Sequence, residues 1–321
     1  MQNIKFSIII PVYNRPKEID ELLASIVTQN FDAEFEVLVI EDGSNQTCKA
    51  IVESYTSQLS NVSYHFKENS GAGASRNYGM QKAIGNYFII LDSDVILPKH
   101  YLSEVKKALT ENYTDAFGGP DAAHESFTYL QKAINYSMTS LLTTGGIRGK
   151  KKALGKFQPR SFNLGISKIA FEKTQGFSKM KNGEDIELTF KLWDNSFKTQ
   201  LIEKAFVYHK RRSSISQFYK QTYGFGTARP ILNKKFPSTA KITYWFPSLF
   251  ILGLTLGVVL ALLGNVYLFS FYYLYFITLL LDAIFKNGII VGFLAIFTSL
   301  TQFLGYGLGF LNSCFFSLTK S

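Results

Sequence analysis

Three long apolar stretches follow one another near the end of this 321-residue chain, and they indicate that this region is surrounded by lipid rather than water. They cover residues 242–263, 266–285 and 288–311, and each reaches the roughly 20 residues that cross a hydrocarbon layer as an α-helix. Their single acid, Asp282, lies near the end of the second stretch, where a carboxylate reaches the headgroup layer. We therefore predict three transmembrane helices; the alternative is a set of helices buried in a globular core.

The chain before residue 242 has the composition of a soluble protein. Its first apolar run is short, so we expect no secretion signal and predict that this part stays in the cytoplasm. Lys234, Lys235 and Lys241 precede the first apolar stretch and Lys286 follows the second, as expected of segments on the cytoplasmic side. Three crossings would leave Ser321 on the outside.

The net charge of +10 comes mainly from the part before residue 242, and it favours an anionic partner. Nucleic acid is one such partner, but anionic lipids and phosphorylated lipid carriers need the same cations and lie beside any membrane protein. We favour the lipids and expect no nucleic acid. The two cysteines, Cys48 and Cys314, fall in different environments, so no disulfide is expected. The basic residues form two clusters, Lys150, Lys151, Lys152, Lys156 and Arg160, and Lys210, Arg211 and Arg212.

Predicted strands and helices alternate along the first part of the chain. Continuous apolar strands of this kind are buried on both faces of a parallel sheet, and ligands of such sheets bind at the carboxyl ends of the strands. The pattern predicts an α/β, Rossmann-like domain over residues 1–226, a coupling segment over 227–241 and a membrane domain over 242–321. The predicted strands are 6–12, 35–40, 62–66, 87–91, 116–119, 162–167 and 199–208, and the predicted helices are 18–28, 46–58, 74–84, 101–112, 127–142, 185–194 and 215–223.

Two carboxylates leave one strand end together in the segment Asp92, Ser93 and Asp94. Such a pair suits Mg²⁺ or Mn²⁺, with phosphate oxygens completing the coordination. The imidazole of His209, which ends another predicted strand, is a candidate third ligand. The competing interpretations are a solvated acidic turn and a histidine that only forms structural hydrogen bonds.

The first two predicted strands also end in polar residues, which predicts a nucleoside pocket. Asp42 is placed to accept the imide hydrogen of a base, Tyr13 to stack on it, and the turn after Asp42 lets the backbone approach. Taken singly, each feature is equally a turn signal. The candidate donor contacts are Pro11, Tyr13, Asn14, Glu41, Asp42, Arg76, Asp92 and Ser93.

A small-residue loop, 69–75, introduces a helix that carries Arg76, which we place near the phosphates of a donor. The loop lacks the glycine spacing of a dinucleotide fingerprint and the lysine of a P-loop. Further along, Glu184 and Asp185 open the helix 185–194. Asp185 is the candidate general base, and the alternative is an acidic first turn that only stabilises the helix.

Taken together, the segments 7–14, 41–44, 74–77, 92–94 and 183–185 resemble, in order and spacing, the family 2 glycosyltransferases of the GT-A fold. The resemblance covers about residues 4–226. It implies a nucleotide-diphospho-sugar donor, a Mg²⁺ or Mn²⁺ ion and inversion at the anomeric carbon. By position, Asp42 matches the base-binding aspartate, Asp94 the principal metal ligand, Asp92 a ribose or metal contact, and Asp185 the catalytic base.

The stretch 209–224 is similar to the end of the catalytic domain in members that build bacterial cell-surface polysaccharide on lipid carriers, which implies a bacterial cytoplasmic membrane. Processive members carry Gln-x-x-Arg-Trp here, whereas Gln221 to Gly224 lacks the Arg-Trp, so we expect one sugar per encounter. We further expect the helix 127–142 and the basic run 145–160 to bind a polyprenyl-diphosphate-linked acceptor. The candidate contacts to acceptor or lipid phosphates are Arg148, Lys150, Lys151, Lys152, Arg160, Glu184, Arg211 and Arg212.

Three rival functions share some of these features. A free polyprenyl phosphate as acceptor would make a lipid-phosphate-sugar, and such an acceptor is already an anion that needs little help from a base. A nucleotide-sugar-binding membrane scaffold or transporter component would use the pocket without transfer. A nucleotidyltransferase would share the metal but would not need the acidic pair at 184 and 185.

Overall fold

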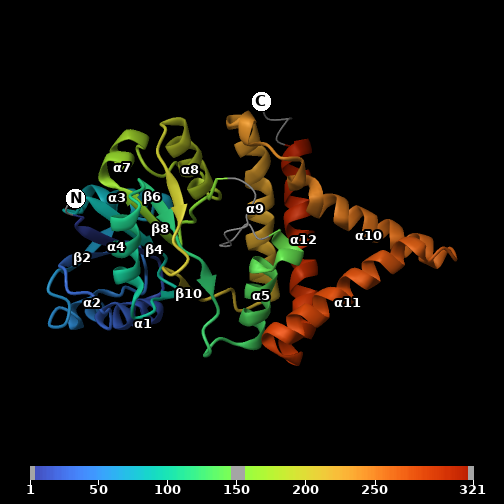
Figure 1. Ribbon diagram of the computed structural model, residues 1–321, viewed down its shortest axis with the longest axis horizontal. Helices are drawn as coiled ribbons and strands as arrows, with labels where there is room; N and C mark the ends of the chain where they lie inside the picture. Colours follow the sequence, from blue (N-terminus) through green and yellow to red (C-terminus); the bar gives the residue numbers. More distant parts are fainter. Residues whose placement is uncertain (1–3, 146–155, 317–321) are drawn as a thin grey trace. The chain divides into compact units, whose positions relative to one another are not determined.

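The computed structural model describes residues 4–145 and 156–316 (Figure 1). The chain separates into two compact units. Unit 1 combines Met1–His124 with Ile147–Lys210, and unit 2 combines Glu125–Gly146 with Arg211–Ser321. This division differs from the predicted boundaries at residues 226 and 241, because two segments assigned to the first domain pack with the C-terminal helices instead.

Unit 1 is built on a seven-stranded mixed sheet with the order β3-β2-β1-β4-β8-β6-β9. Its first four strands in this order run parallel, which confirms the predicted α/β fold. β8 runs antiparallel to both of its neighbours, β4 and β6, a direction that its short sequence does not reveal. The strands are β1 (Phe6–Val12), β2 (Phe35–Asp42), β3 (Val62–Lys67), β4 (Tyr87–Leu91), β6 (Ala116–Gly118), β8 (Asn163–Ser167) and β9 (Thr199–Leu201).

Side chains along β1 alternate between two hydrophobic cores, one on each face of the sheet. Ile8 and Ile10 belong to the core that includes Leu22 of α1 (Pro16–Val27). Ile9 belongs to the core that includes Met80 of α3 (Ala72–Lys82) and Leu188 of α8 (Glu184–Asp194). Burial on both faces explains why β1 is apolar at consecutive positions. Each such side chain contributes about 1.5–3 kcal/mol when fully buried.

Most helices of unit 1 lie close to the predicted ranges, but α7 (Lys168–Thr174) was not predicted. The predicted strand 199–208 is divided into β9 and β10 (Val207–His209), which belong to different sheets. The predicted helix 46–58 is helical only at α2, and its remainder forms turns. A second, three-stranded sheet has the order β5-β10-β7 and consists of β5 (Val95–Ile96), β10 (Val207–His209) and β7 (Asp121–Ala122). The helices are α1 (Pro16–Val27), α2 (Lys49–Ser54), α3 (Ala72–Lys82), α4 (Tyr101–Glu111), α7 (Lys168–Thr174) and α8 (Glu184–Asp194).

Unit 2 is entirely helical in its described part. The predicted helix 127–142 is divided at Ser140, whose extended backbone ends α5 and whose side chain caps α6. The predicted helix 215–223 continues through Pro230 to residue 235 as α9. The helices are α5 (Tyr129–Thr139), α6 (Leu141–Thr144), α9 (Ile215–Lys235), α10 (Phe246–Leu262), α11 (Tyr267–Asn287) and α12 (Ile289–Phe316).

Three helical segments of unit 2 are long and apolar enough to cross a membrane, as the sequence predicts. They are Ile242–Leu262, Tyr267–Asn287 and Ile289–Phe316. Most of the first two lies open rather than buried within the protein, whereas α12 is covered more extensively. A large apolar surface of this kind is stable only against other apolar material, which indicates membrane association.

Candidate functional site

The candidate site lies at the carboxyl edge of the main sheet. Because β1 pairs in parallel with both β2 and β4, the loops that follow these three strands leave at the same edge. The loop after β1 carries Tyr13 to Arg15, the loop after β2 carries 43–48, and the loop after β4 carries 92–94. Segments more than 70 residues apart in the sequence therefore meet at one end of the sheet.

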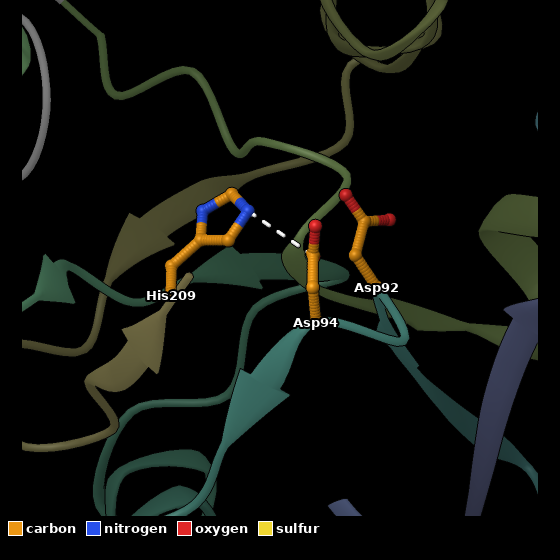
Figure 2. Close-up of side chains that lie close together, drawn as sticks. All are labelled: Asp92, Asp94 and His209. Carbon is orange, nitrogen blue, oxygen red and sulfur yellow. Dashed lines mark ion pairs between the residues drawn. The ribbon is translucent and has the colours of Figure 1, made fainter. Parts of the chain in front are cut away.

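Asp92, Asp94 and His209 lie together at this edge (Figure 2). One ligand atom from each lies within 4.8 Å of the others. Nε2 of His209 is 3.3 Å from Oδ1 of Asp94. Two carboxylates and one imidazole are a donor set that suits Mn²⁺ and, through the carboxylates, Mg²⁺, so these residues fit the expected ion. Within residues 4–145 and 156–316, no other group of three acidic, histidine or cysteine side chains is gathered this closely.

Asp94 is held as a carboxylate by Arg15 and His209. Burial alone would raise its pKa, but His209 and the guanidinium of Arg15, which contacts Oδ2, hold that pKa well below the usual value. The ring of His209 stacks on Phe162, with centroids 4.8 Å apart, and its Nδ1 is 3.8 Å from a carboxylate oxygen of the buried Asp121. The orientation of the imidazole is therefore fixed from both sides.

Arg76 joins the acidic pair of β4 to the start of α8. Its side chain is 4% exposed, and its two terminal nitrogens lie 2.8 Å from Oδ1 of Asp92 and 2.9 Å from Oε1 of Glu184. Its guanidinium also lies over the ring of Phe177, 5.1 Å from the centroid. Asp185, the next residue after Glu184, is thereby tied to the same edge of the sheet as Asp92.

Two neighbouring carboxylates open α8. Gly183 precedes them with φ of 81°, a conformation that glycine adopts without strain. Burial raises the pKa of Glu184, the charge of Asp185 raises it further, and Arg76 offsets part of the effect. Asp185 lies 3.4 Å from the backbone nitrogen of Ser161 and 3.9 Å from Nη1 of Arg160. Arg160 is therefore a neighbour of the candidate base.

Asp42 is enclosed by hydrogen-bond donors. It accepts hydrogen bonds from Nζ of Lys67 at 2.5 Å and from the backbone N–H groups of Ser70 and Gly71, each at 2.9 Å. Burial alone would raise the pKa of Asp42, but the bonds from Lys67 and Ser70 keep it below its ordinary value. The carboxylate therefore stays ionised and orders the loop between β3 and α3.

The loops after β1 and β2 are locked together through Asn14. Its Oδ1 accepts hydrogen bonds from the N–H groups of Asn45 and Gln46, and its own N–H donates to Ser44 Oγ at 2.7 Å. Ser44 in turn donates to Glu41, which is fully buried and also accepts from the N–H of Cys48 at 2.8 Å. The carboxylate of Glu41 is therefore bound within the protein rather than open to a ligand.

Tyr13 is 51% accessible, and its exposed ring stands at the rim of the site. Pro11 and Ser93, two other expected donor contacts, are buried within the unit. In unit 2, Arg211 is buried and lies 3.2 Å from Oδ1 of Asn135, and Arg212 is partly exposed. The expected phosphate contacts Arg148, Lys150, Lys151 and Lys152 fall outside the described residues.

Sequence reasoning missed the partners of the acidic residues. Asp94 is contacted by Arg15, and Asp42 is contacted by Lys67. His209 has Asp121 nearby, with 3.8 Å between Nδ1 and the carboxylate oxygen. Arg15 directly follows the motif at 11–14, and Lys67 ends the strand beside β2, so their positions in the sequence weakly indicate a place in the site. The position of Asp121 gives no such indication, because its approach to His209 depends on the pairing of β7 with β10.

Residues 7–174, just over half of the chain, match the model of the family described as glycosyl transferase family 2. Over 114 residues the chain is 37% identical to the poly(ribitol-phosphate) beta-N-acetylglucosaminyltransferase TarS of Staphylococcus aureus, covering 35% of this chain and 20% of that protein. Over 208 residues it is 27% identical to the GalNAc(5)-diNAcBac-PP-undecaprenol beta-1,3-glucosyltransferase of Campylobacter jejuni, covering 64% of this chain and 62% of that protein.

The chain thus spans a fifth of one relative and less than two thirds of the other. Among solved structures, it resembles the mannosyltransferase PcManGT of Pyrobaculum calidifontis in complex with GDP-Man and Mn²⁺, with a TM-score of 0.62, 15% identity and coverage of 97% of this chain and 87% of that one. It also resembles residues 1–349 of S. aureus TarS in complex with UDP-GlcNAc, with a TM-score of 0.52, 20% identity and coverage of 96% and 91%. At such identities the likeness shows the shared GT-A fold.

Proposed function

Because this chain belongs to glycosyl transferase family 2, we propose that it transfers one sugar from a nucleotide-diphospho-sugar to a hydroxyl of a lipid-linked acceptor, with inversion at the anomeric carbon. The observation that carries the proposal is the bridge formed by Arg76. Its buried guanidinium binds both Asp92 and Glu184, which holds them at the same edge of the sheet. Asp92 belongs to the candidate metal site, and Glu184 is next to the candidate base. A donor bound through its diphosphate at the candidate metal site would thus present its sugar near α8.

The donor is held by residues on three loops. Asp92, Asp94 and His209 would bind Mg²⁺ or Mn²⁺, and the bound ion would supply positive charge to the departing diphosphate. PcManGT, which shares the fold, has been solved with Mn²⁺. Tyr13, whose ring is exposed, stacks on the base, and Asp42 either accepts an N–H of the base directly or holds the loop 68–71 that borders it.

The transfer step uses Asp185 as the general base. As the acceptor oxygen forms its bond to the anomeric carbon, the bond from that carbon to the diphosphate breaks and Asp185 takes the hydroxyl proton. Arg160, 3.9 Å from Asp185, is placed to bind an anionic group of the acceptor. Glu184 positions the site through Arg76.

The proposed acceptor is attached to a polyprenyl diphosphate. The Campylobacter relative is named for an undecaprenol-linked acceptor, and three apolar segments indicate that this chain is held at a membrane. We place it in the cytoplasmic membrane of a bacterium with the catalytic unit on the cytoplasmic face, which the lysines near the ends of the apolar stretches support. Arg148, Lys150, Lys151, Lys152, Arg211 and Arg212 remain candidate contacts to lipid phosphates.

The test is transfer by the purified full chain in lipid, with a panel of nucleotide sugars and lipid-linked acceptors and with Mg²⁺ or Mn²⁺. Asp185→Asn should lower kcat by 10²-fold or more, because the base contributes typically 10²–10⁴-fold. Asp194→Asn, at the exposed far end of the same helix, is the matched control and should act like the wild type.

Three results would change the proposal. Near-normal turnover by Asp185→Asn on a free polyprenyl phosphate would favour synthesis of a lipid-phosphate-sugar, whose acceptor is already an anion. Release of labelled nucleotide into the product would indicate nucleotidyl transfer. Binding of a nucleotide sugar without consumption, even with extracted lipid acceptors, would indicate a scaffold or transporter component.

A further inference from the structure

Helices α9 and α12 of unit 2 are in backbone contact along a seam of glycines. An added Cβ on Gly226 of α9 would lie 2.2 Å from the carbonyl oxygen of Tyr306, and one on Gly309 of α12 would lie 2.2 Å from that of Tyr223. Gly305 is covered in the same way by Thr222 and Tyr219. Higher residue numbers on α9 thus meet higher numbers on α12, so the two helices run side by side in the same direction along the second half of α12.

α9 is too polar to lie in the hydrocarbon of a bilayer. It exposes Lys220 near its start and Lys234 and Lys235 at its end, positions about 21 Å apart along a helix. Gln221 and Arg229 lie between these ends, and polar or charged side chains at the centre of a membrane are costly. Because α9 and α12 lie side by side, the second half of α12 must share the depth of α9, which is the headgroup layer.

α10 and α11 contact α12 at several places along its length, and Phe303 of α12 packs against both Phe250 of α10 and Tyr275 of α11. Near the start of α10, Ser248 donates a hydrogen bond to the carbonyl of Gly307 at 3.0 Å. Near the end of α11, Ile284 lies against Gly292. These last two contacts are 15 residues apart, or about 22 Å along α12. The other ends of α10 and α11 meet at a short turn, so the two helices separate toward α12 (Figure 1).

The depth of this hairpin depends on the direction of α12. If α12 crossed the bilayer, Lys241 and Lys286, at the two open ends of the hairpin, would lie on opposite sides, and the turn at Gly264 and Asn265 would end inside the hydrocarbon. Exposed turns do not occur there, because their backbone groups would lack hydrogen bonds. If α12 lies flat, both lysines are at one surface and the turn reaches the other.

The two faces of α12 fit the flat arrangement. One face carries small and hydroxyl residues covered by α5 and α9; for example, Ser137 of α5 lies 2.6 Å from Thr298 and 3.0 Å from Ser299. The other face is apolar and open. Its exposed residues are Ile290, Phe293, Phe297, Leu308 and Phe315. A helix with one polar, covered face and one apolar, open face is suited to lie in the membrane surface.

Arg229 is a further reason to place α9 outside the hydrocarbon. Its side chain is 6% exposed, its guanidinium lies over the ring of Tyr244 at 4.1 Å, and among the described residues its Nη1 has no hydrogen-bond partner. A buried guanidinium without a counter-charge is costly in a protein interior. The cost would be higher still in a helix surrounded by hydrocarbon, which favours the headgroup depth for α9.

We infer that α5, α9 and α12 form a platform in the plane of the membrane surface, with the Phe and Leu face of α12 in the acyl chains, and that within residues 156–316 only the hairpin of α10 and α11 crosses the bilayer. The partner of this surface is one leaflet of the bilayer. The inference does not depend on the proposed reaction, since it rests only on contacts within unit 2.

Single cysteines introduced into a Cys48→Ser, Cys314→Ser background of the full chain test the topology. An impermeant maleimide applied to sealed vesicles should label Asn287→Cys and Asn312→Cys from the same side, and Asn265→Cys from the other. Asn195→Cys, exposed in unit 1, reports the side of that unit. Labelling of positions 287 and 312 from opposite sides would overturn the inference, as would failure to label position 265 from the far side.

Spin labels on the open face of α12 give a second, independent measurement. Phe293→Cys and Leu308→Cys lie 15 residues apart, about 22 Å along the helix. In a flat helix, their collision rates with oxygen and with a polar relaxation agent should give the same depth. A difference in depth close to the full separation would show that α12 crosses the bilayer.

Discussion

At the scale of single residues, the site depends on side chains held by partners that the motifs do not contain. His209 is the clearest case, because its ring is fixed between Phe162 and Asp94 with Asp121 behind it. Outer partners of this kind orient a metal ligand and set its affinity. The geometry therefore separates residues that would bind an ion from those that only hold the binders in place.

We expect His209→Ala to weaken the binding of Mn²⁺ by about 10–100-fold, the range in which disturbed ligand shells change metal affinity. The measurement is the loss of the free Mn²⁺ electron paramagnetic resonance signal on titration, with and without nucleotide diphosphate. His124→Ala is the control, since His124 contacts Tyr208 near the same small sheet but is outside the metal-type group. Equal affinity in both variants would remove His209 from the proposed ligands.

At the scale of helices and strands, the glycine seam between α9 and α12 decides how unit 2 holds together. Gly305 and Gly309 meet backbone or β-branched atoms of α9 at distances no side chain tolerates, whereas Leu308, one position away, is on the open face. The seam replaces hydrophobic side-chain packing with close backbone approach, which is a common basis of helix association in lipid.

Gly309→Val should therefore lower the stability of the full chain in lipid nanodiscs by at least about 1–3 kcal/mol, the usual cost of overfilling a packed interface. Leu308→Val, the matched control, should change it little. Thermal unfolding midpoints measure both. If Gly309→Val unfolds at the wild-type temperature, the two helices are not in the contact described here.

The elements also show what the sequence could predict. Runs such as 8–12 and 87–91 are apolar at every position because both faces of the sheet are covered, so the strands and the carboxyl edge could be found. The direction of β8 and the break at Ser140 could not, because strand pairing and capping are settled by distant contacts. The acidic motifs could be recognised because they follow the ends of predicted strands. Their partners Arg15 and Lys67 could not, because they meet the acidic residues only in the folded chain.

At the scale of the whole chain, charge is distributed very unevenly. Between Arg211 and Phe316, Asp282 is the only acid, and it is paired with Lys286. The cations of α9 and of the segment before α10 therefore outnumber the acids of this part of the chain. Anionic lipid is the counter-charge that the membrane provides, at about 1 kcal/mol for each cation near the surface.

We predict that the thermal stability of the full chain rises when phosphatidylglycerol replaces part of a phosphatidylcholine bilayer, and that the gain shrinks at high salt. Lys234→Gln, whose side chain is exposed at the end of α9, should lose a larger part of this gain than Arg229→Gln, whose side chain is buried on the same helix. Differential scanning fluorimetry in nanodiscs gives the comparison. Identical gains in the two variants would mean that the exposed end of α9 does not contact anionic lipid.

The separation of α10 and α11 has a mechanical consequence. The hairpin is about 22 Å wide where it meets α12 and narrows to a short turn at its tip. With the platform beside its wide end, unit 2 displaces far more lipid area from one leaflet than from the other. Each copy then acts as a wedge in the bilayer, so the lateral pressure and curvature of the leaflet that holds the platform would contribute to where the protein settles.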